Sequence, residues 1–350
     1  MNGKDKESFI YRSAAILAVL ISVMIIITAV FFIIAKVSSP QKNPNEGKEP
    51  SIPASNDGDN NYPFRQNIGN VFPSYGANNA VVEANKITSE NIILVNITDG
   101  EILASRLSGD SHIVYPASLT KVMTLIVVFE NLKNQDALNE QLTISEAVAK
   151  QMSDAGASGA GLKAGETLTV KDLIYAMMLS SDGTASVTLA EYIASSEKEF
   201  VKLMNEKAKE MGLLKTNFVN CTGLHDNMHY TTCQDMAAIM TYAVKNTFCL
   251  EVMSALKYRT TTNIHTDGIT FYNSLLVTRI DEAKAAGITA SPSSCEIIAG
   301  KTGFTDEGKY CLATYARGND GKYYVVVSTK APDKFGYIKD YVYMYNTYVK

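Results

Sequence analysis

The sequence predicts an α+β fold (an α/β sandwich), in which strands from both ends of the globular part form one antiparallel sheet around an inserted helical segment. Three observations lead to this prediction. Strand patterns occur early, within residues 91–105, and return late, within residues 296–328. Between them, the pattern is helical from Pro116 to about Asn131 and mainly helical from Val170 to about Asn246. We expect a transmembrane helix and a linker before this body.

An apolar run near the N-terminus predicts a membrane anchor. Residues 14–35 (AAILAVLISVMIIITAVFFIIA) contain only Ser22 and Thr28 as polar members. As a helix the run would reach roughly 33 Å, enough to cross a hydrocarbon core of about 30 Å. A cleaved signal peptide is the alternative, but its apolar core is about 7–15 residues long and ends at a small-residue site. No such site follows Ala35, so we expect an uncleaved anchor behind a short tail, residues 1–13.

Residues 36–79 have the composition of a flexible linker. Six of the nine prolines fall within this segment, interleaved with asparagine, glycine, serine and aspartate. Such a segment has too little apolar surface to offset the entropy lost on ordering. We therefore expect it to tether a globular domain, residues 80–350, to the membrane.

Charge and cysteine content exclude some classes of function. The formal net charge is −4 and no basic tract stands out, so we expect no nucleic-acid binding. The five cysteines are scattered and odd in number, which argues against a complete disulfide framework. We expect buried free thiols.

Each element of the predicted body has its own signal. The runs NIILVN (91–96) and EILAS (101–105) flank an Asp-Gly pair, which predicts a β-hairpin. After Pro116 the pattern is helical to about Asn131 and apolar on most faces, as in a buried helix. Further helical patterns occupy residues 171–179, 185–194, 199–212 and 231–246.

Strand patterns return in the C-terminal part. Residues 309–315 (KYCLATY) and 323–328 (YYVVVS) alternate or run apolar around a Gly-Asn-Asp-Gly turn, and residues 296–299 precede them. Residues 333–350 have the pattern of a tyrosine-rich helix, which we expect to pack on the sheet.

The stretch YPASLTKVMT places Ser118 three residues before Lys121 at the start of the buried helix. A serine and a lysine at positions i and i+3 of a helix share a face, as a nucleophile and its base must. The motif alone is not specific, because Ser-x-x-Lys also begins at Ser39, Ser195 and Ser254. Ser39 lies in the linker, Ser195 lies in a polar stretch, and Ser254 lies on a plausible helix that no second motif accompanies. Ser118 is therefore the best candidate.

Two further motifs accompany this one. Lys301-Thr-Gly303 occurs once, directly before an apolar strand, and Ser181-Asp-Gly183 follows an apolar helix. The motifs Ser-x-x-Lys, Ser-x-Asn and Lys-Thr-Gly, in this order, mark penicillin-binding proteins and serine β-lactamases. Here glycine stands where the second motif has asparagine.

The chain resembles D-alanyl-D-alanine carboxypeptidases of the low-molecular-weight penicillin-binding type. The resemblance extends from about residue 85 to the C-terminus through YPASLTKVMT, SGAGLKAGETLTVKDLIYAMML, LAEYIA, TNFVNCTGLHDNMHYTT and GKTGFTDEGKYCLA. It implies a β-lactamase/transpeptidase-like fold, removal of D-alanine from peptidoglycan stem pentapeptides, and acylation by β-lactams. It implies no cofactor and no metal. It also implies a domain on the wall side of a bacterial cell membrane, with Met1 in the cytoplasm.

The resemblance also implies roles for single residues. Ser118 would attack the carbonyl between two D-alanines, with neutral Lys121 as the general base. Ser181 would relay a proton to the departing amine, and Lys301 would supply positive charge for the substrate carboxylate. Further substrate contacts are expected from Thr302, from Gly303, and from an oxyanion hole formed by the backbone N–H groups of Ser118 and Phe304.

Gly183 departs from the family pattern. The asparagine expected there contacts the lysine base and the substrate amide, and glycine can do neither. We therefore expect lower activity than in a relative with asparagine, and a gain of activity in a Gly183→Asn variant.

Three alternative interpretations have weaker support. HDNMH (225–229) resembles the zinc motif H-E-x-x-H but lacks the helix that would direct both imidazoles to one metal. A serine β-lactamase would share the three motifs, but no Glu-x-x-x-Asn follows Ser181. A non-catalytic receptor for β-lactams or wall peptides fits the anchor and Gly183, but the short tail before the anchor leaves no room for an output domain.

Overall fold

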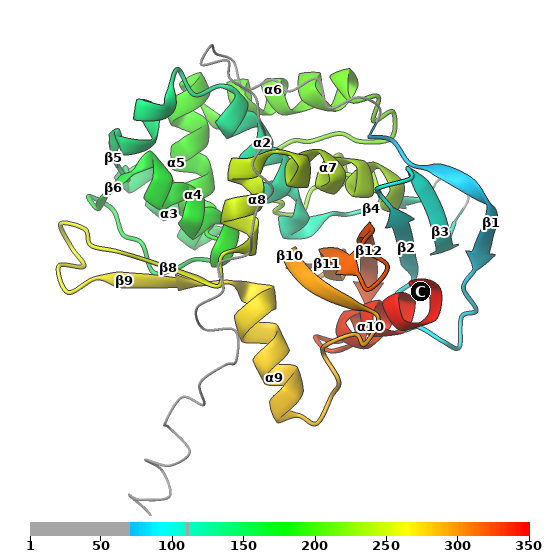
Figure 1. The fold of residues 1–350 in the computed structure, drawn as a ribbon. Helices are drawn as coiled ribbons and strands as arrows, with labels where there is room; N and C mark the ends of the chain where they lie inside the picture. The colour runs from blue at the N-terminus through cyan, green and yellow to red at the C-terminus, as the bar shows by residue number, and fades with distance from the viewer. Residues whose placement is uncertain (1–70, 110–111) are drawn as a thin grey trace, which may run out of the picture. The chain divides into compact units, whose positions relative to one another are not determined.

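The structure, a computed structural model, describes residues 71–109 and 112–350 (Figure 1). The expected tail, the anchor at 14–35 and most of the linker lie outside the described residues. Among the helices that are described, none is long and apolar enough to cross a membrane.

A six-stranded sheet forms the centre of the domain, in the order β1-β3-β2-β12-β11-β10. All neighbouring strands are antiparallel except β1 and β3, which are parallel. The predicted hairpin and the predicted late strands are confirmed, and they join where β2 pairs with β12. The strands are β1 (Ser74–Val81), β2 (Asn91–Asn96), β3 (Glu101–Arg106), β10 (Cys295–Thr305), β11 (Lys309–Gly318) and β12 (Tyr323–Ala331).

The edge strand β1 was not predicted, and it begins inside the segment expected to be linker. Its sequence, SYGANNAV, is mostly exposed and has no apolar alternation. Backbone hydrogen bonds fix its place instead. The N–H of Ser74 donates to the carbonyl of Gly100 at 3.0 Å, and the N–H of Val82 donates to that of Ser105 at 2.9 Å.

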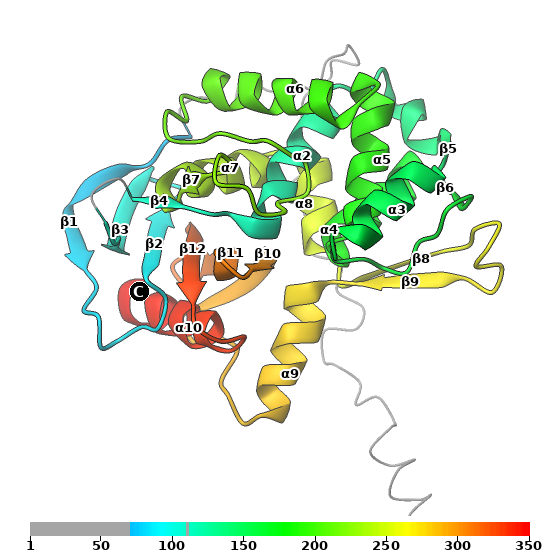
Figure 2. The same ribbon diagram turned by 180° about the vertical axis from the view of Figure 1, so that it is seen from behind.

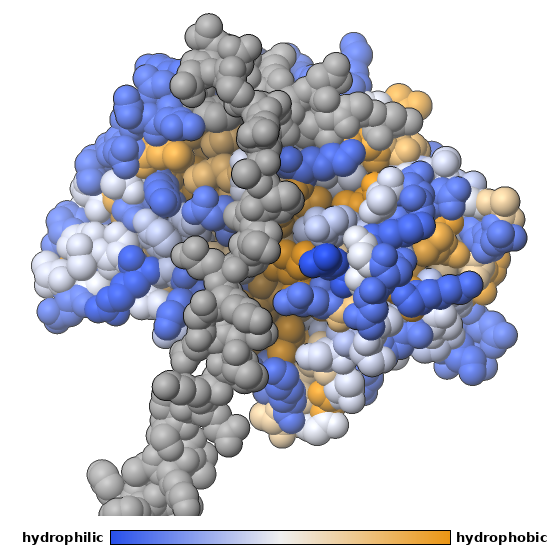
Figure 3. All heavy atoms as spheres, in the orientation of Figure 1, coloured by the Kyte–Doolittle hydropathy of each residue, from blue (hydrophilic) through white to orange (hydrophobic). Residues whose placement is uncertain are grey.

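The predicted helical insert lies between β3 and β10 and covers one face of the sheet (Figures 1 and 2). Short strand pairs connect its helices. In Figure 3, hydrophilic side chains cover much of the side that carries the β8–β9 hairpin. The helices are α2 (Thr120–Glu130), α3 (Glu146–Asp154), α4 (Val170–Leu179), α5 (Gly183–Ala194), α6 (Glu197–Glu210), α7 (Cys233–Lys245) and α8 (Thr247–Ser254). The strand pairs are β4 (Ile113–Val114) with β7 (Thr231–Thr232), β5 (Gln141–Thr143) with β6 (Thr167–Thr169), and β8 (Lys257–Thr260) with β9 (Ile269–Tyr272). The remaining turns and helices are η1 (Ala117–Leu119), η2 (Gln135–Asn139), a π-helical turn η3 (Ser274–Arg279), α9 (Ile280–Ala285) and α10 (Gly336–Tyr348).

Side chains of β2 point alternately into two cores. Ile93 and Val95 pack against the helical insert, whereas Ile92 and Leu94 pack on the opposite face with α10. Because both faces of the strand are covered, its sequence is continuously apolar rather than alternating. All five cysteines are buried and free, as predicted.

The C-terminal helix α10 packs on the sheet, as predicted, and is tied to the N-terminal strands. Its side chain Asp340 is buried and accepts four hydrogen bonds of 2.6–3.0 Å from the N–H and hydroxyl groups of Thr88 and Ser89. The tyrosines Tyr337, Tyr341 and Tyr345 are fully buried beneath the helix.

Three helices of the insert meet at a buried ion pair. Nζ of Lys207 on α6 lies 2.9 Å from a carboxylate oxygen of Glu130 on α2, and these side chains are only 5% and 4% exposed. The same amine donates to the hydroxyl of Tyr242 on α7 at 2.7 Å, and this hydroxyl donates to Glu130. The two opposite charges therefore lie together where water has little access, and Glu210 on α6 adds a half-exposed carboxylate 3.2 Å from the same amine.

Candidate active site

The predicted nucleophile and base are adjacent at the start of α2. Ser118 belongs to η1 and is half-buried, whereas Lys121, one turn later, is buried. Nζ of Lys121 donates to Oγ of Ser118 at 3.1 Å and to the carbonyl oxygen of Thr222 at 2.7 Å. Once neutral, this amine is within reach of the serine proton.

Two glycines pack closely against the backbone at Ala117 and Ser118. A Cβ at Gly223 would lie 1.9 Å from the carbonyl oxygen of Ala117, and one at Gly303 would lie 2.9 Å from the nitrogen of Ser118. Ala117 itself has a φ of 49°, a left-handed conformation that is unfavourable for a residue with a Cβ. Strain next to Ser118 is thus maintained by close packing, and the glycine of the third motif has a structural role.

The second and third motifs meet each other. Lys301 on β10 is fully buried, and its Nζ donates to Oγ of Ser181 at 2.9 Å and to the carbonyl oxygen of Thr302 at 2.9 Å. Ser181 has a φ of 59°, a second left-handed residue at this site. Since Gly303 touches Ser118, all three motifs lie around one site.

Burial lowers the pKa of both lysines. The pKa of Lys121 falls from 10.5 to about 8 because burial disfavours the ammonium, while Cys221 and Asp182 act in the opposite direction. Burial also places the pKa of Lys301 well below its ordinary value, and the charge of Lys121 lowers it further. The site therefore disfavours holding two protonated lysines and favours one neutral amine.

Asp182, the middle residue of the second motif, fastens the loop between α3 and β6 onto α5. Its carboxylate accepts the N–H of Ala185 at 2.7 Å, which caps α5, and the N–H of Ala160 in the loop at 2.6 Å. The N–H of Gly183 donates to the carbonyl oxygen of Ser158 at 2.9 Å. The loop is thereby held against the start of α5.

The loop occupies the space beside Gly183. A Cβ at this position would lie 3.0 Å from the Cβ of Ala157 and 3.1 Å from the Sδ of Met152. Both distances are shorter than ordinary van der Waals contact. An asparagine at this position therefore requires Ala157 and Met152 to shift, a condition that the sequence did not reveal.

Phe304, expected to contribute a backbone N–H group, lies on the edge strand β10. Its ring is 49% exposed and packs on that of Tyr310, with 4.6 Å between the ring centroids. Because β10 ends the sheet, one side of its backbone is not paired with any other strand of the described residues. The residue directly follows the contact between Gly303 and Ser118.

One partner of Lys121 was missed by the sequence analysis. Thr222 presents its carbonyl oxygen to the lysine from a turn that the side chain of Asn220 closes. Oδ1 of Asn220 accepts the N–H groups of Thr222 at 3.2 Å and of Gly223 at 2.7 Å, and its Nδ2 donates to the carbonyl oxygen of Leu224 at 2.9 Å. The segment NCTGL belongs to the resemblance, but no motif spacing indicates that a carbonyl would hold the lysine.

The histidines of HDNMH are arranged differently from a zinc site. His229 is buried, its Nδ1 accepts the N–H of Val219 at 3.1 Å, and its Nε2 lies 2.7 Å from Oγ1 of Thr120. Both ring nitrogens thus have protein partners, and burial lowers the pKa of the ring to about 4, so it is neutral. Within the described ranges, no group of three or more His, Cys, Asp or Glu side chains could hold a metal.

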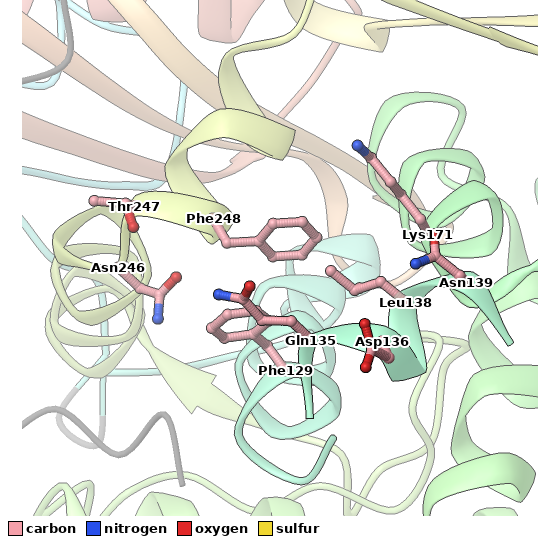
Figure 4. Close-up of a pocket in the computed structure, with 9 residues that line it drawn as sticks. All are labelled: Phe129, Gln135, Asp136, Leu138, Asn139, Lys171, Asn246, Thr247 and Phe248. Atoms are coloured by element: carbon pink, nitrogen blue, oxygen red, sulfur yellow. The ribbon is translucent and has the colours of Figure 1, made fainter. Parts of the chain in front are cut away.

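A separate pocket of about 360 Å³ lies at the other end of α2 (Figure 4). The rings of Phe129 and Phe248 stack at its wall, with 4.7 Å between their centroids. Phe129 is eleven residues beyond Ser118, or roughly 16 Å along the helix. None of the predicted site residues lines this pocket.

Comparisons with known proteins agree with this geometry. A family model, peptidase S11, D-alanyl-D-alanine carboxypeptidase, matches residues 78–331. The chain is 32% identical over 250 residues to D-alanyl-D-alanine carboxypeptidase DacF of Bacillus subtilis, covering 70% of this chain and 58% of that protein. It is 33% identical over 170 residues to D-alanyl-D-alanine carboxypeptidase DacC of Escherichia coli, covering 48% of this chain and 42% of that protein. The chain thus spans about half the length of these relatives.

A solved structure has the same fold. The DD-transpeptidase of Streptomyces K15 superimposes with a TM-score of 0.64 at 26% sequence identity. The match covers 75% of this chain and 98% of that chain. The similarity therefore includes nearly all of that protein.

Proposed function

Because the chain belongs to the peptidase S11 family of D-alanyl-D-alanine carboxypeptidases, we propose that it removes the terminal D-alanine from peptidoglycan stem pentapeptides. The reaction would proceed through an acyl intermediate on Ser118. One observation carries this proposal: a serine hydroxyl lies 3.1 Å from a buried amine, beside a second serine–lysine pair at 2.9 Å. This arrangement supports nucleophilic acyl transfer, for which no metal or cofactor is required.

In the proposed reaction, Oγ of Ser118 attacks the carbonyl carbon between the two D-alanines, and Lys121 takes the serine proton. The carbon–nitrogen bond then breaks, and Ser181 relays the proton from the Lys121 ammonium to the departing amine of D-alanine, which leaves Lys121 neutral again. Water hydrolyses the remaining ester on Ser118 and releases the tetrapeptide. The backbone N–H groups of Ser118 and Phe304 would stabilise the oxyanion, a contribution of about 10²–10³ in rate for each donor.

Substrate binding would also set the charges of the two lysines. A carboxylate next to Lys301 favours the ammonium form and raises its pKa. The resulting positive charge in turn favours the neutral form of Lys121. The proton distribution needed for catalysis is therefore promoted by the terminal carboxylate itself.

We further propose that residues 14–35 anchor the enzyme in the bacterial cell membrane, with residues 1–13 in the cytoplasm and the linker, 36–79, leading to the catalytic domain, 80–350, on the wall side. The length and apolarity of the anchor segment support this, and peptidoglycan lies outside the membrane. β-Lactams would acylate Ser118 because they present a reactive carbonyl to the same nucleophile.

The decisive test is release of D-alanine from a stem pentapeptide by the full-length chain. We expect one D-alanine per peptide and a tetrapeptide that is not shortened further. If a folded chain were acylated by penicillin at Ser118 but released no D-alanine, the receptor alternative would be favoured. If it hydrolysed penicillin rapidly without releasing D-alanine, the β-lactamase alternative would be favoured.

The pKa of Lys121 predicts how acylation depends on pH. With a pKa of about 8, the lysine is neutral in about one-tenth of the molecules at pH 7 and about nine-tenths at pH 9. Because only the neutral amine can accept the serine proton, kcat/KM should rise about tenfold over this range and then level off. Stopped-flow acylation by a chromogenic β-lactam, measured over this range, checks the sign. A constant or falling rate would exclude Lys121 as the base.

The packing around Gly183 changes the expectation for asparagine at this position. The Gly183→Asn variant alone should lose stability without gaining activity, because its side chain meets Ala157. Adding Ala157→Gly removes the nearer contact and leaves only the flexible side chain of Met152 to move aside, and kcat/KM for D-alanine release should then rise about fivefold, a typical value for one hydrogen bond. The Ala157→Gly variant is the control. A double variant no more active than this control would refute a role for asparagine in this chain.

A further inference from the structure

A serine outside the three motifs contacts one of them. Oγ of Ser274, in the π-helical turn η3, lies 2.9 Å from Oγ1 of Thr302 on β10. Both residues are half-buried. No motif in the sequence includes Ser274.

The turn that carries Ser274 is rigidly held by the residue before it. Asn273 is 2% exposed, and its Oδ1 accepts two N–H groups of η3, at 3.1 and 2.9 Å. Its Nδ2 donates to two carbonyl oxygens at the end of α8 and just beyond, at 3.2 and 3.1 Å. The side chain of Asn273 thus fixes the start of η3, and π-helical turns are common at functional sites.

A glycine allows η3 to approach β10 closely. A Cβ at Gly300 would lie 2.3 Å from Cδ2 of Leu275, so no larger residue fits at this point. Leu275 is fully buried against the strand. This contact sets Ser274 beside Thr302, two residues along β10 from the glycine.

The two hydroxyl groups hydrogen-bond to each other, so only one of their two protons remains available to a further acceptor. A hydroxyl group donates one hydrogen bond and accepts two. When Ser274 donates to Thr302, the proton of Thr302 is free for another acceptor; with the roles reversed, the proton of Ser274 is free. Lys301 directly precedes Thr302 in the sequence, and its ammonium form prefers an anionic partner. An O–H group next to an ammonium group suits a carboxylate.

We infer that Ser274 is a positioning residue, which orients the hydroxyl of Thr302 toward the terminal carboxylate of the peptide substrate. This inference rests on the proposed function of the site. Without Ser274, Thr302 keeps its hydroxyl group but loses the partner that fixes its direction. The loss should weaken substrate binding, which appears in KM, and leave the acylation chemistry at Ser118 nearly unchanged.

The experiment compares a peptide that ends in D-Ala-D-Ala with the same peptide carrying a C-terminal amide. Binding is measured by isothermal titration calorimetry on the full-length chain with Ser118→Ala, so that no turnover occurs. Adding Ser274→Ala should raise Kd for the free acid about tenfold and leave Kd for the amide within about twofold. Thr278→Ala, at an exposed position of the same turn, is the matched control and should change neither value.

Equal changes in Kd for acid and amide, or no change, would overturn the inference, because a merely structural effect does not distinguish the two peptides. With Ser118 intact, Ser274→Ala should raise KM about tenfold and leave kcat within about twofold. A fall in kcat with unchanged KM would also overturn it. Failure of the parent chain to release D-alanine would refute the proposed function separately, since the binding measurement does not depend on turnover.

Discussion

The Ser118→Ala variant is expected to release D-alanine at least about 10⁴-fold more slowly than the parent chain. By the proposal above, Oγ of Ser118 forms the bond to the substrate, and it is the hydroxyl group to which Nζ of Lys121 donates, at 3.1 Å. What remains in the variant is binding and oxyanion stabilisation, which cannot form the acyl intermediate. The assay is D-alanine release by the full-length chain, with penicillin labelling as a second readout that should also disappear.

The chain contains its own control for this variant. Ser254 begins another Ser-x-x-Lys pattern, but its exposed hydroxyl group donates to the carbonyl oxygen of Glu251 at 3.2 Å. Ser254→Ala should therefore retain the parent rate. If Ser118→Ala kept more than about one-hundredth of the parent rate, the nucleophile would have to be another residue.

The Lys207→Met variant is expected to lower the free energy of unfolding by about 3–5 kcal/mol, the largest effect that we expect on stability. Removing the cation leaves Glu130 as a buried carboxylate between α2 and α6, with the hydroxyl group of Tyr242 as its nearest partner. Methionine has similar length and fills the space, so the loss is mainly electrostatic. Thermal unfolding followed by circular dichroism should show a Tm lower by roughly 6–20 °C.

A surface pair on the same helix provides the comparison. Lys202 and Glu199 on α6 lie 2.7 Å apart, but their side chains are 58% and 51% exposed. Lys202→Met should therefore change stability by less than about 1 kcal/mol. The Glu130→Gln/Lys207→Met double variant should be more stable than Lys207→Met alone, because no charge remains buried. Equal losses for Lys202→Met and Lys207→Met would contradict a special role for the buried pair.

The parts of the fold that the sequence predicted are those with repeating local patterns. The apolar run of β2, the Asp-Gly turn after it and the helical periodicity of α4 to α7 are each contained within about twenty residues of chain. The three motifs were equally local, and the structure brings Ser118, Ser181 and Lys301 to one site through segments far apart in the sequence.

What the sequence did not predict depends on contacts between distant segments. The polar strand β1 is held by backbone hydrogen bonds to β3, to which side-chain patterns contribute little. The turn η3 depends on the buried side chain of Asn273 and on the missing Cβ of Gly300, neither of which forms a periodic pattern. The space beside Gly183 is likewise filled by Ala157 from another loop.

The pairing of β2 with β12 has a consequence for the order of events in synthesis and export. Ile93 is paired with Ser105 of β3 on one side and with Val327 of β12 on the other, so β2 lacks its second neighbour until almost the whole domain has been translated. At about 5–20 residues per second this interval lasts on the order of 10–50 s. During this time the six-stranded sheet cannot be completed. Such late closure suits a domain that, by the proposal above, must cross the membrane before it folds against the wall.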